Sequence, residues 1–242
     1  MTGRRLEPAL PEGADKVAMV RSMFDTIAPR YDVVNRLMTF GLDSIWRRRT
    51  VTALALPAGS TVLDLACGTG DLCRMLESRG LHPIGADLSF GMLGARRTTA
   101  PLLQADGATL ALANASVDGL TCGFALRNFA DLQAVLREAA RVVRPGGRIA
   151  LLDVCEPQHP VMRAGHRLWF RHGAPMIGGL LSDATAYRYL PRSLAYLPTG
   201  AELRSQVVGA GFSGVNRRLL SAGVVQLLTA TRVGLSPASP TR

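Results

Sequence analysis

The feature that most constrains the fold is an alternation of short apolar runs and helical stretches between residues 60 and 154. The apolar runs are bounded by glycine or acidic residues, as buried strands are, and the stretches between them have helical spacing. Because strands joined through a helix run parallel, the alternation predicts a parallel sheet with helices on both faces. The expected strands cover 62–66, 83–87, 102–104, 119–125 and 148–154, and the expected helices cover 71–79, 92–97 and 131–143.

Other elements flank this alternation on both sides. Residues 16–56 have helical spacing with a break at Pro29, which predicts an N-terminal helical extension. After a further helix over 199–210, two strands over 214–220 and 223–231 follow one another with no helix between them. These two must pair antiparallel through a tight turn, so the predicted sheet is mixed and has seven strands.

Residues 157–198 interrupt the pattern and hold three of the four tyrosines and three of the four histidines. We interpret this segment as a helical insertion that forms a lid, with ordinary helix packing as the alternative. Residues 1–15 and 235–242 lack periodicity and are rich in proline, glycine or serine, so both ends are expected to be disordered. The chain is therefore expected to form a single domain over residues 16–234.

Composition limits the class of protein. The chain is 48% hydrophobic and 19% charged, which excludes a disordered, collagen-like or disulfide-stabilised protein. We find no apolar run of membrane-spanning length and no secretory signal, so a soluble cytoplasmic protein is expected. The net charge of +10 rests almost wholly on arginine, since Lys16 is the single lysine. Such basicity suits nucleic acid or an anionic membrane surface, but a GC-rich genome also produces it without selection for binding.

The cysteines and histidines show no spacing typical of metal ligands. Cys67, Cys73, Cys122 and Cys155 form no C-x-x-C pair, and the histidines form no H-x-x-x-H pattern. We therefore expect no metal site and four small buried thiols.

A glycine-rich loop, D-L-A-C-G-T-G-D, follows the first expected strand. Gly68 and Gly70 let the backbone approach a ligand closely. The dinucleotide fingerprint G-x-G-x-x-G fits poorly, because Cys73 stands where its third glycine belongs. The loop is similar to the D-x-G-x-G-x-G loop of class I S-adenosylmethionine-dependent methyltransferases, with Asp64 in place and Ala66 instead of the first glycine.

Two further acids follow in the order that an adenosine-type cofactor needs. Asp87 ends the second expected strand, where a carboxylate can accept both ribose hydroxyls. Asp106 follows the third strand, where it can bind the adenine amino group. A helix-terminal acid and an Asp-Gly turn are ordinary alternatives for each. The combination of loop and two acids is more specific than any one of them.

Five motifs then make a resemblance close. They are M-F-D-T-I-A-P-R-Y-D-V-V-N at 23–35, G-L-D-S-I-W-R-R at 41–48, L-R-N-F at 126–129, E-x-x-R-V-V-R-P-G-G at 138–147 and Y-R-Y-L-P-x-S at 187–193. In these motifs the chain resembles the ubiquinone/menaquinone biosynthesis C-methyltransferase family from residue 16 to about residue 228. The resemblance implies an α/β fold of the class I, Rossmann-like methyltransferase type and S-adenosylmethionine as cofactor.

The resemblance also implies the reaction, which is methylation of a ring carbon of a polyprenylated quinol. Demethylmenaquinol is the expected substrate, with a ubiquinone-type benzoquinol or a secondary-metabolite aromatic as alternatives. An RNA methyltransferase is more remote, because the N/D-P-P-Y/F motif of base-amine methylation is missing after the fourth strand. No nucleic-acid partner is expected, while peripheral contact with the inner face of the membrane and a homodimer stay open.

Site residues follow from the matching positions. The resemblance assigns Arg127, Asn128 and Tyr31 to catalysis: Arg127 acts on the quinol electrostatically or through a water, Asn128 holds a quinol oxygen and Tyr31 closes the pocket. The cofactor residues that it implies are Asp64, Gly68, Thr69, Gly70, Asp87, Asp106, Gly107 and Gly123.

Some positions depart from the family pattern. Asp43 stands where ubiquinone-side members often carry His and some menaquinone-only members carry Asp. Gly123 and Ala125 replace the serine and glycine of S-F-G-L-R-N, so a side-chain contact at position 123 is in doubt.

Overall fold

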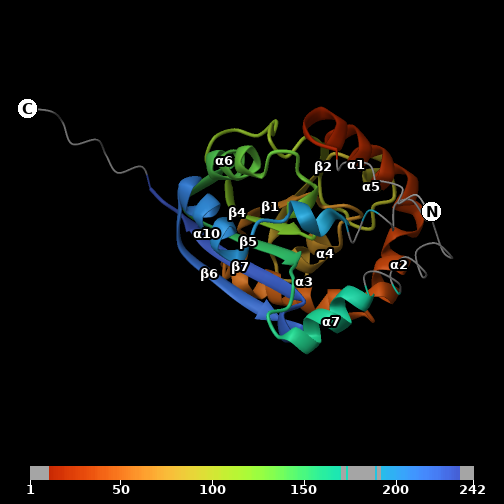
Figure 1. Cartoon of the computed structure of the whole chain (residues 1–242). Helices are drawn as coiled ribbons and strands as arrows, with labels where there is room; N and C mark the ends of the chain where they lie inside the picture. The colour runs from red at the N-terminus through yellow and green to blue at the C-terminus, as the bar shows by residue number, and fades with distance from the viewer. Residues whose placement is uncertain (1–10, 170–172, 174–188, 190–191, 235–242) are drawn as a thin grey trace, which may run out of the picture.

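A computed structural model describes residues 11–169, 173, 189 and 192–234 of the chain. At its centre lies one seven-stranded sheet in the order β3-β2-β1-β4-β5-β7-β6 (Figure 1). All neighbouring strands pair in parallel except β7, which is antiparallel to both β5 and β6. The strands are β1 (Thr61–Leu65), β2 (His82–Asp87), β3 (Leu102–Gln104), β4 (Val117–Gly123), β5 (Val143–Val154), β6 (Phe212–Leu220) and β7 (Val225–Arg232). The predicted mixed sheet is confirmed.

Helices cover both faces of this sheet. They are α1 (Gly13–Ile27), α2 (Tyr31–Met38), α3 (Leu42–Leu54), α4 (Asp71–Glu77), α5 (Phe90–Gly94), α6 (Leu132–Val142), α7 (Pro160–Leu168) and α10 (Gly200–Gly209). Short 3-10 turns lie at Ala28–Arg30, Leu126–Asn128, Leu194–Tyr196 and Ser221–Gly223. The predicted break at Pro29 is confirmed as the 3-10 turn between α1 and α2.

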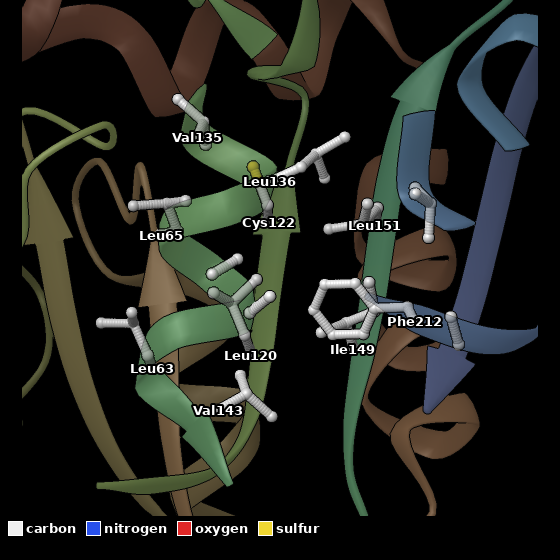
Figure 2. Packing of buried hydrophobic residues seen from close by; sticks show 14 of the residues in the cluster. Leu63, Leu65, Leu120, Cys122, Val135, Leu136, Val143, Ile149, Leu151 and Phe212 are labelled. Carbon is white, nitrogen blue, oxygen red and sulfur yellow. The ribbon is translucent and has the colours of Figure 1, made fainter. Parts of the chain in front are cut away.

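Each central strand sends alternate side chains into two separate cores, as the period of two in a strand requires. Leu63 and Leu65 of β1 pack with α6 and α10 on one face, and Figure 2 shows the side chains of that core between β1, β4, β5 and α6. Val62 points to the opposite face, where it packs with Trp46 of α3 and Leu72 of α4. The near-continuous apolar strands of the sequence therefore follow from a sheet that is covered on both sides.

Three elements have a boundary that differs by three residues or more from the one expected. Helix α1 begins at Gly13, before the expected start at residue 16. Strand β5 begins at Val143 rather than at residue 148. The R-P-G-G segment, which was expected to form a separate turn, is a bulge within the strand. Gly146 adopts a φ of +79° within it, a conformation that favours glycine. Helix α5 lies at Phe90–Gly94 rather than at 92–97, since Ser89 caps it by accepting the Met92 N–H.

About half of the expected lid over 157–198 lies outside the described residues. Helix α7 and the turn Leu194–Tyr196 are its described parts. Disorder was expected over residues 1–15 and 235–242; of these only 11–15 are described, and residues 13–15 belong to helix α1.

Candidate active site

A pocket lies at the carboxyl ends of β1, β2, β3 and β4, beneath the N-terminal helices α1 and α2. The sheet order changes direction between β1 and β4, and open α/β sheets bind ligands at such a switch point. The pocket encloses a cavity of about 100 Å³, lined by both polar and apolar side chains. The predicted site residues in its lining are Tyr31, Gly68, Thr69, Asp87, Asp106, Gly107, Gly123 and Asn128.

The glycine-rich loop lies against this pocket, and a hydrogen bond to the last residue of β2 holds it in place. Gly68 has a φ of +57°, and a side chain added there would meet no other atom within 4 Å. Its N–H donates to Asp87 Oδ2 at 2.8 Å. Gly70 has a φ of +89° but packs against Thr98 rather than lining the pocket, so its part is to shape the loop.

The two predicted carboxylates line the side of the pocket formed by β2 and β3. Asp87 Oδ1 accepts the N–H of Ser89 at 2.8 Å, and burial raises the pKa of this carboxyl. Asp106 Oδ1 accepts the N–H of Ala108 at 2.9 Å, which closes the predicted Asp-Gly turn. Gly107 lies under Phe129, where an added Cβ would come within 3.0 Å of the ring. Local backbone contacts thus orient both acids while they line the pocket.

Asp64 is fully buried and does not line the pocket. Its Oδ1 accepts the Thr121 hydroxyl at 2.8 Å, and the Cys73 thiol lies 3.5 Å from its Oδ2. Burial raises its pKa to about 7, against the opposing effects of the Thr121 hydrogen bond and the Arg47 charge. The structure therefore places Asp64 beneath the glycine-rich loop, where it braces β1 against β4 and α4.

The N-terminal helices form the roof of the pocket and are attached to the sheet by carboxylates that the sequence reasoning missed. Asp25 of α1 accepts the Ser89 hydroxyl at 2.6 Å and the Gly91 N–H at 2.8 Å. Asp32 of α2 accepts the Thr69 hydroxyl at 2.8 Å and pairs with Arg97 at 3.1 Å. The Tyr-Asp motif contained this signal, but the partners are distant in sequence and only the fold brings them together.

Arg127 and Asn128 lie in the turn after β4, and only Asn128 lines the pocket. The guanidinium of Arg127 is buried behind the pocket wall. It forms an ion pair with Asp153 of β5 and a 3.1 Å hydrogen bond to the Ser193 hydroxyl. Asn128 Oδ1 accepts the Tyr189 hydroxyl at 3.4 Å. The two residues therefore have different environments, one in the interior and one at the pocket wall.

Tyr31 lies over the same part of the pocket. Burial raises the pKa of its phenol, while the charges of Arg47 and Arg127 act in the opposite direction. Its hydroxyl is therefore neutral at physiological pH.

Two residues that were not predicted complete the β4 end of the pocket. Arg47 of α3 is 6% exposed, and Asp71 at the start of α4 is 8% exposed; both line the pocket. An i, i+4 Asp43–Arg47 pair in an otherwise arginine-rich helix was the available signal, but charge runs in helices usually face solvent.

Lys16 attaches helix α1 of the roof to the opposite wall of the pocket. Its ammonium donates to the Phe129 carbonyl at 2.7 Å and lies 3.5 Å from the centre of the Tyr196 ring. Because Phe129 lines the pocket, this lysine joins α1, the wall of the pocket and the turn at Leu194–Tyr196.

The described residues contain neither a membrane-spanning helix nor a cluster of metal ligands. No helix among them is long and apolar enough to cross a membrane. Within the same residues, no group of three or more His, Cys, Asp or Glu side chains is placed to hold a metal ion.

Comparison with known proteins agrees with this architecture. Solved structures of similar fold include the putative methyltransferase in complex with the Haloferax volcanii Trm112 methyltransferase activator (TM-score 0.65, 17% identity, 87% of this chain and 98% of that one). Phosphoethanolamine N-methyltransferase 2 of Haemonchus contortus, solved with S-adenosylhomocysteine, also matches (TM-score 0.65, 12% identity, 89% and 60%). At these identities the likeness concerns the fold.

Sequence relatives are much more similar. The ubiquinone/menaquinone biosynthesis C-methyltransferase of Syntrophotalea carbinolica is 40% identical over 88% of this chain and 93% of the relative. The demethylmenaquinone methyltransferase of Thermus thermophilus is 40% identical over 85% and 97%, and that of Mycolicibacterium paratuberculosis is 39% identical over 88% and 94%. The model of the ubiE/COQ5 methyltransferase family matches residues 13–232. With the sheet order, the glycine-rich loop and the two acids in place, the chain belongs to the ubiE/COQ5 methyltransferase family and is an S-adenosylmethionine-dependent methyltransferase.

Proposed function

We propose that this enzyme methylates the ring carbon of demethylmenaquinol to give menaquinol. The observation that carries the proposal is the meeting of two sets of residues in one pocket: the loop and acids suited to an adenosine-type cofactor, and Tyr31 with Asn128 on the wall by β4. Relatives that match over most of their length are named demethylmenaquinone methyltransferases, which favours the naphthoquinol over the benzoquinol.

The chain's own residues suit this cofactor. Asp87 and Asp106 carry acceptors for ribose hydroxyls and an adenine amino group, and Gly68 leaves open space for the ligand above the loop. Asp64, Gly70 and Arg127 act from behind the lining, the first two by fixing the loop. When bound, the cofactor supplies an electrophilic methyl group on a sulfonium.

Positioning and charge are what the protein must add. Since Asn128 Oδ1 faces the Tyr189 hydroxyl, its amide N–H groups are left to donate to a quinol oxygen. Tyr31, neutral and above the pocket, excludes water and packs on the ring. Because a guanidinium is a very weak base, Arg127 favours the electron-rich quinolate electrostatically rather than by accepting a proton. Its ion pair with Asp153 fixes the turn that presents Asn128.

The roof of the pocket supports a contact with the membrane surface, where a polyprenylated substrate resides. Exposed apolar side chains cluster on α2 and the following turn, with Phe40 74% and Val33 55% exposed. The ring centre of Phe40 lies 5.0 Å from that of Trp169 at the end of α7, and α7 also carries exposed Leu168. Exposed apolar side chains of α2 and α7 are therefore neighbours, and Figure 1 shows the two helices close to each other. Flotation with anionic vesicles tests this part: we expect wild type to float and Phe40→Ser to float less.

The substrate is tested with purified enzyme, methyl-labelled S-adenosylmethionine and three acceptors: reduced demethylmenaquinone, a reduced demethylated benzoquinone and bulk RNA. We expect label on the naphthoquinol, with less on the benzoquinol and none on RNA. Replacing Arg127 with Ala should lower turnover while cofactor affinity stays nearly unchanged, because its guanidinium does not line the pocket. Label on RNA alone, or none despite cofactor binding, would refute the quinol assignment.

A further inference from the structure

Arg47 is a buried cation whose position the reaction described so far does not explain. Two cationic side chains line the pocket within the described residues, Arg21 and Arg47. Arg21 is half-exposed on α1 and lies near Asp25, whereas Arg47 is 6% exposed and lies where α3 passes under the β4 end. An arginine so deeply buried needs compensating contacts, since burial of an unsatisfied charge is costly.

Those contacts are incomplete. Across the described parts of the chain, Arg47 Nε is buried without a hydrogen-bond partner. The carboxylates nearest to Nε belong to Asp43 at 3.9 Å and Asp71 at 4.0 Å, which balance its charge but lie beyond hydrogen-bond range. Its remaining neighbour of note is the Phe124 ring, whose centre lies 5.2 Å from the guanidinium carbon. The guanidinium therefore has charge compensation and unused donors.

The unused donors lie at a defined place in the pocket. A Cβ added to Gly123, the last residue of β4, would come within 3.4 Å of an Arg47 terminal nitrogen. Asp106 follows β3 and Asp87 ends β2, and the order β3-β2-β1-β4 puts both carboxylates on the far side of the glycine-rich loop. Since neighbouring strands are about 4.8 Å apart, β3 and β4 are separated by roughly 14 Å. The pocket thus has acids at one end and a cation at the other.

This polarity matches the two ends of the cofactor. Its adenosine end offers hydroxyl and amino donors, which carboxylates accept, and its amino-acid end carries a carboxylate, which a guanidinium binds through paired hydrogen bonds. We propose that Arg47 binds the α-carboxylate of the S-adenosylmethionine amino-acid end. Arg47 thereby sets which end of the cofactor reaches β4. The inference rests on the cofactor and not on the identity of the quinol.

The test measures binding in the absence of any acceptor. Affinities of wild type and Arg47→Met are compared by calorimetry for S-adenosylhomocysteine, which carries the carboxylate, and for 5′-methylthioadenosine, which lacks the amino-acid end. We expect the variant to bind S-adenosylhomocysteine about 10- to 100-fold more weakly, the range for losing charge-assisted hydrogen bonds. Its affinity for 5′-methylthioadenosine should stay within about twofold of wild type.

Two controls separate this role from a structural one. Arg74→Met removes another partner of Asp71, at 2.6 Å, without touching the pocket lining, and should leave both affinities unchanged. If Arg47→Met does not fold, wild type and Arg47→Lys are compared for S-adenosylmethionine against its decarboxylated form. Wild type should then prefer the carboxylated ligand, and the lysine variant should prefer it less.

Three results would overturn the proposal. One is an equal loss for both adenosine ligands in Arg47→Met, and another is no loss for either. The third is intact S-adenosylhomocysteine binding with a raised KM for the quinol, which would assign Arg47 to the acceptor. A failure to methylate demethylmenaquinol leaves these binding measurements unaffected, so the two proposals fail separately.

Discussion

At the scale of single residues, the most unusual group is the carboxyl of Asp64, which is buried on the α3 and α4 side of the sheet. Its pKa of about 7 lies far above the value near 3.9 of an unfolded chain. Between these two values the folded state binds more protons at this group than the unfolded state does. The ionisation of buried Asp64 is thus a penalty: its contribution to the free energy of unfolding falls as pH rises from about 4 to 7. The penalty is absent below pH 4 and complete above pH 7.

Asp64→Asn should remove this penalty while keeping an acceptor for the Thr121 hydroxyl. We expect urea unfolding of the variant to show a weaker loss of stability between pH 4 and 7 than wild type shows. Asp15→Asn, an exposed change in the first turn of α1, serves as control and should follow wild type. Equal slopes for wild type and Asp64→Asn would show that this carboxyl titrates normally.

The buried pair of Arg127 and Asp153 gives a second prediction at this scale. Asp153 is fully buried, and its side chain also accepts the N–H groups of Arg127 and Val154. Asp153→Asn leaves the arginine charge without its partner, which should destabilise the fold by about 3 kcal/mol. The double variant Arg127→Met with Asp153→Asn should recover much of that stability but not turnover. A single variant as stable as wild type would contradict the pairing.

The site residues show which parts of the pocket could be predicted from the sequence and which could not. The loop and the two acids could be predicted because their spacing is local and their chemistry is specific. Arg127 matched a motif, but that it lies behind the lining depends on Asp153, which is distant in sequence. Arg47 could not be predicted, because an arginine in a run of three is more often solvent-exposed.

At the scale of elements, the N-terminal helices form part of the site rather than an appendage. Asp25 and Asp32 attach α1 and α2 to the β2–α5 turn and to the glycine-rich loop, while Lys16 attaches α1 to the opposite wall. The helical spacing predicted these elements and Pro29 predicted the break. It did not predict their partners, since those contacts are made across the sheet edge.

Lys16 provides a direct measurement of this attachment. Burial lowers its pKa to about 8, with Glu12 acting in the opposite direction. Because it is the single lysine, selective ¹⁵N-lysine labelling yields one side-chain resonance, which should titrate near pH 8. In the unfolded chain the value is near 10.4, so stability should rise between about pH 8 and 10 and Lys16→Met should abolish that rise. A titration midpoint above 10 would mean that α1 does not enclose this ammonium.

At the scale of the whole molecule, the relative directions of the strands could be predicted from connection rules. Strands that are joined through a helix run parallel. Strands β6 and β7 follow one another with no helix between them, so they were expected to pair antiparallel, as they do. Strand β5 was placed too short because Gly146 and Gly147 in sequence are typical of a turn, whereas here they form a bulge inside the strand. The fold class could thus be predicted from the sequence, whereas local irregularities such as the bulge in β5 could not.

The arrangement of the whole pocket leads to one claim about chemistry: the acceptor atom is a ring carbon. In the proposed function, Tyr31, Asn128 and the β4 end would hold a quinol by an oxygen, so a misplaced ring would be methylated on that oxygen instead. The most direct test is ¹³C NMR of the product made from reduced demethylmenaquinone and methyl-¹³C-labelled S-adenosylmethionine. We predict a single labelled methyl in the aryl-methyl region; a methoxy signal, or label on neither atom while the cofactor is bound, would contradict the account.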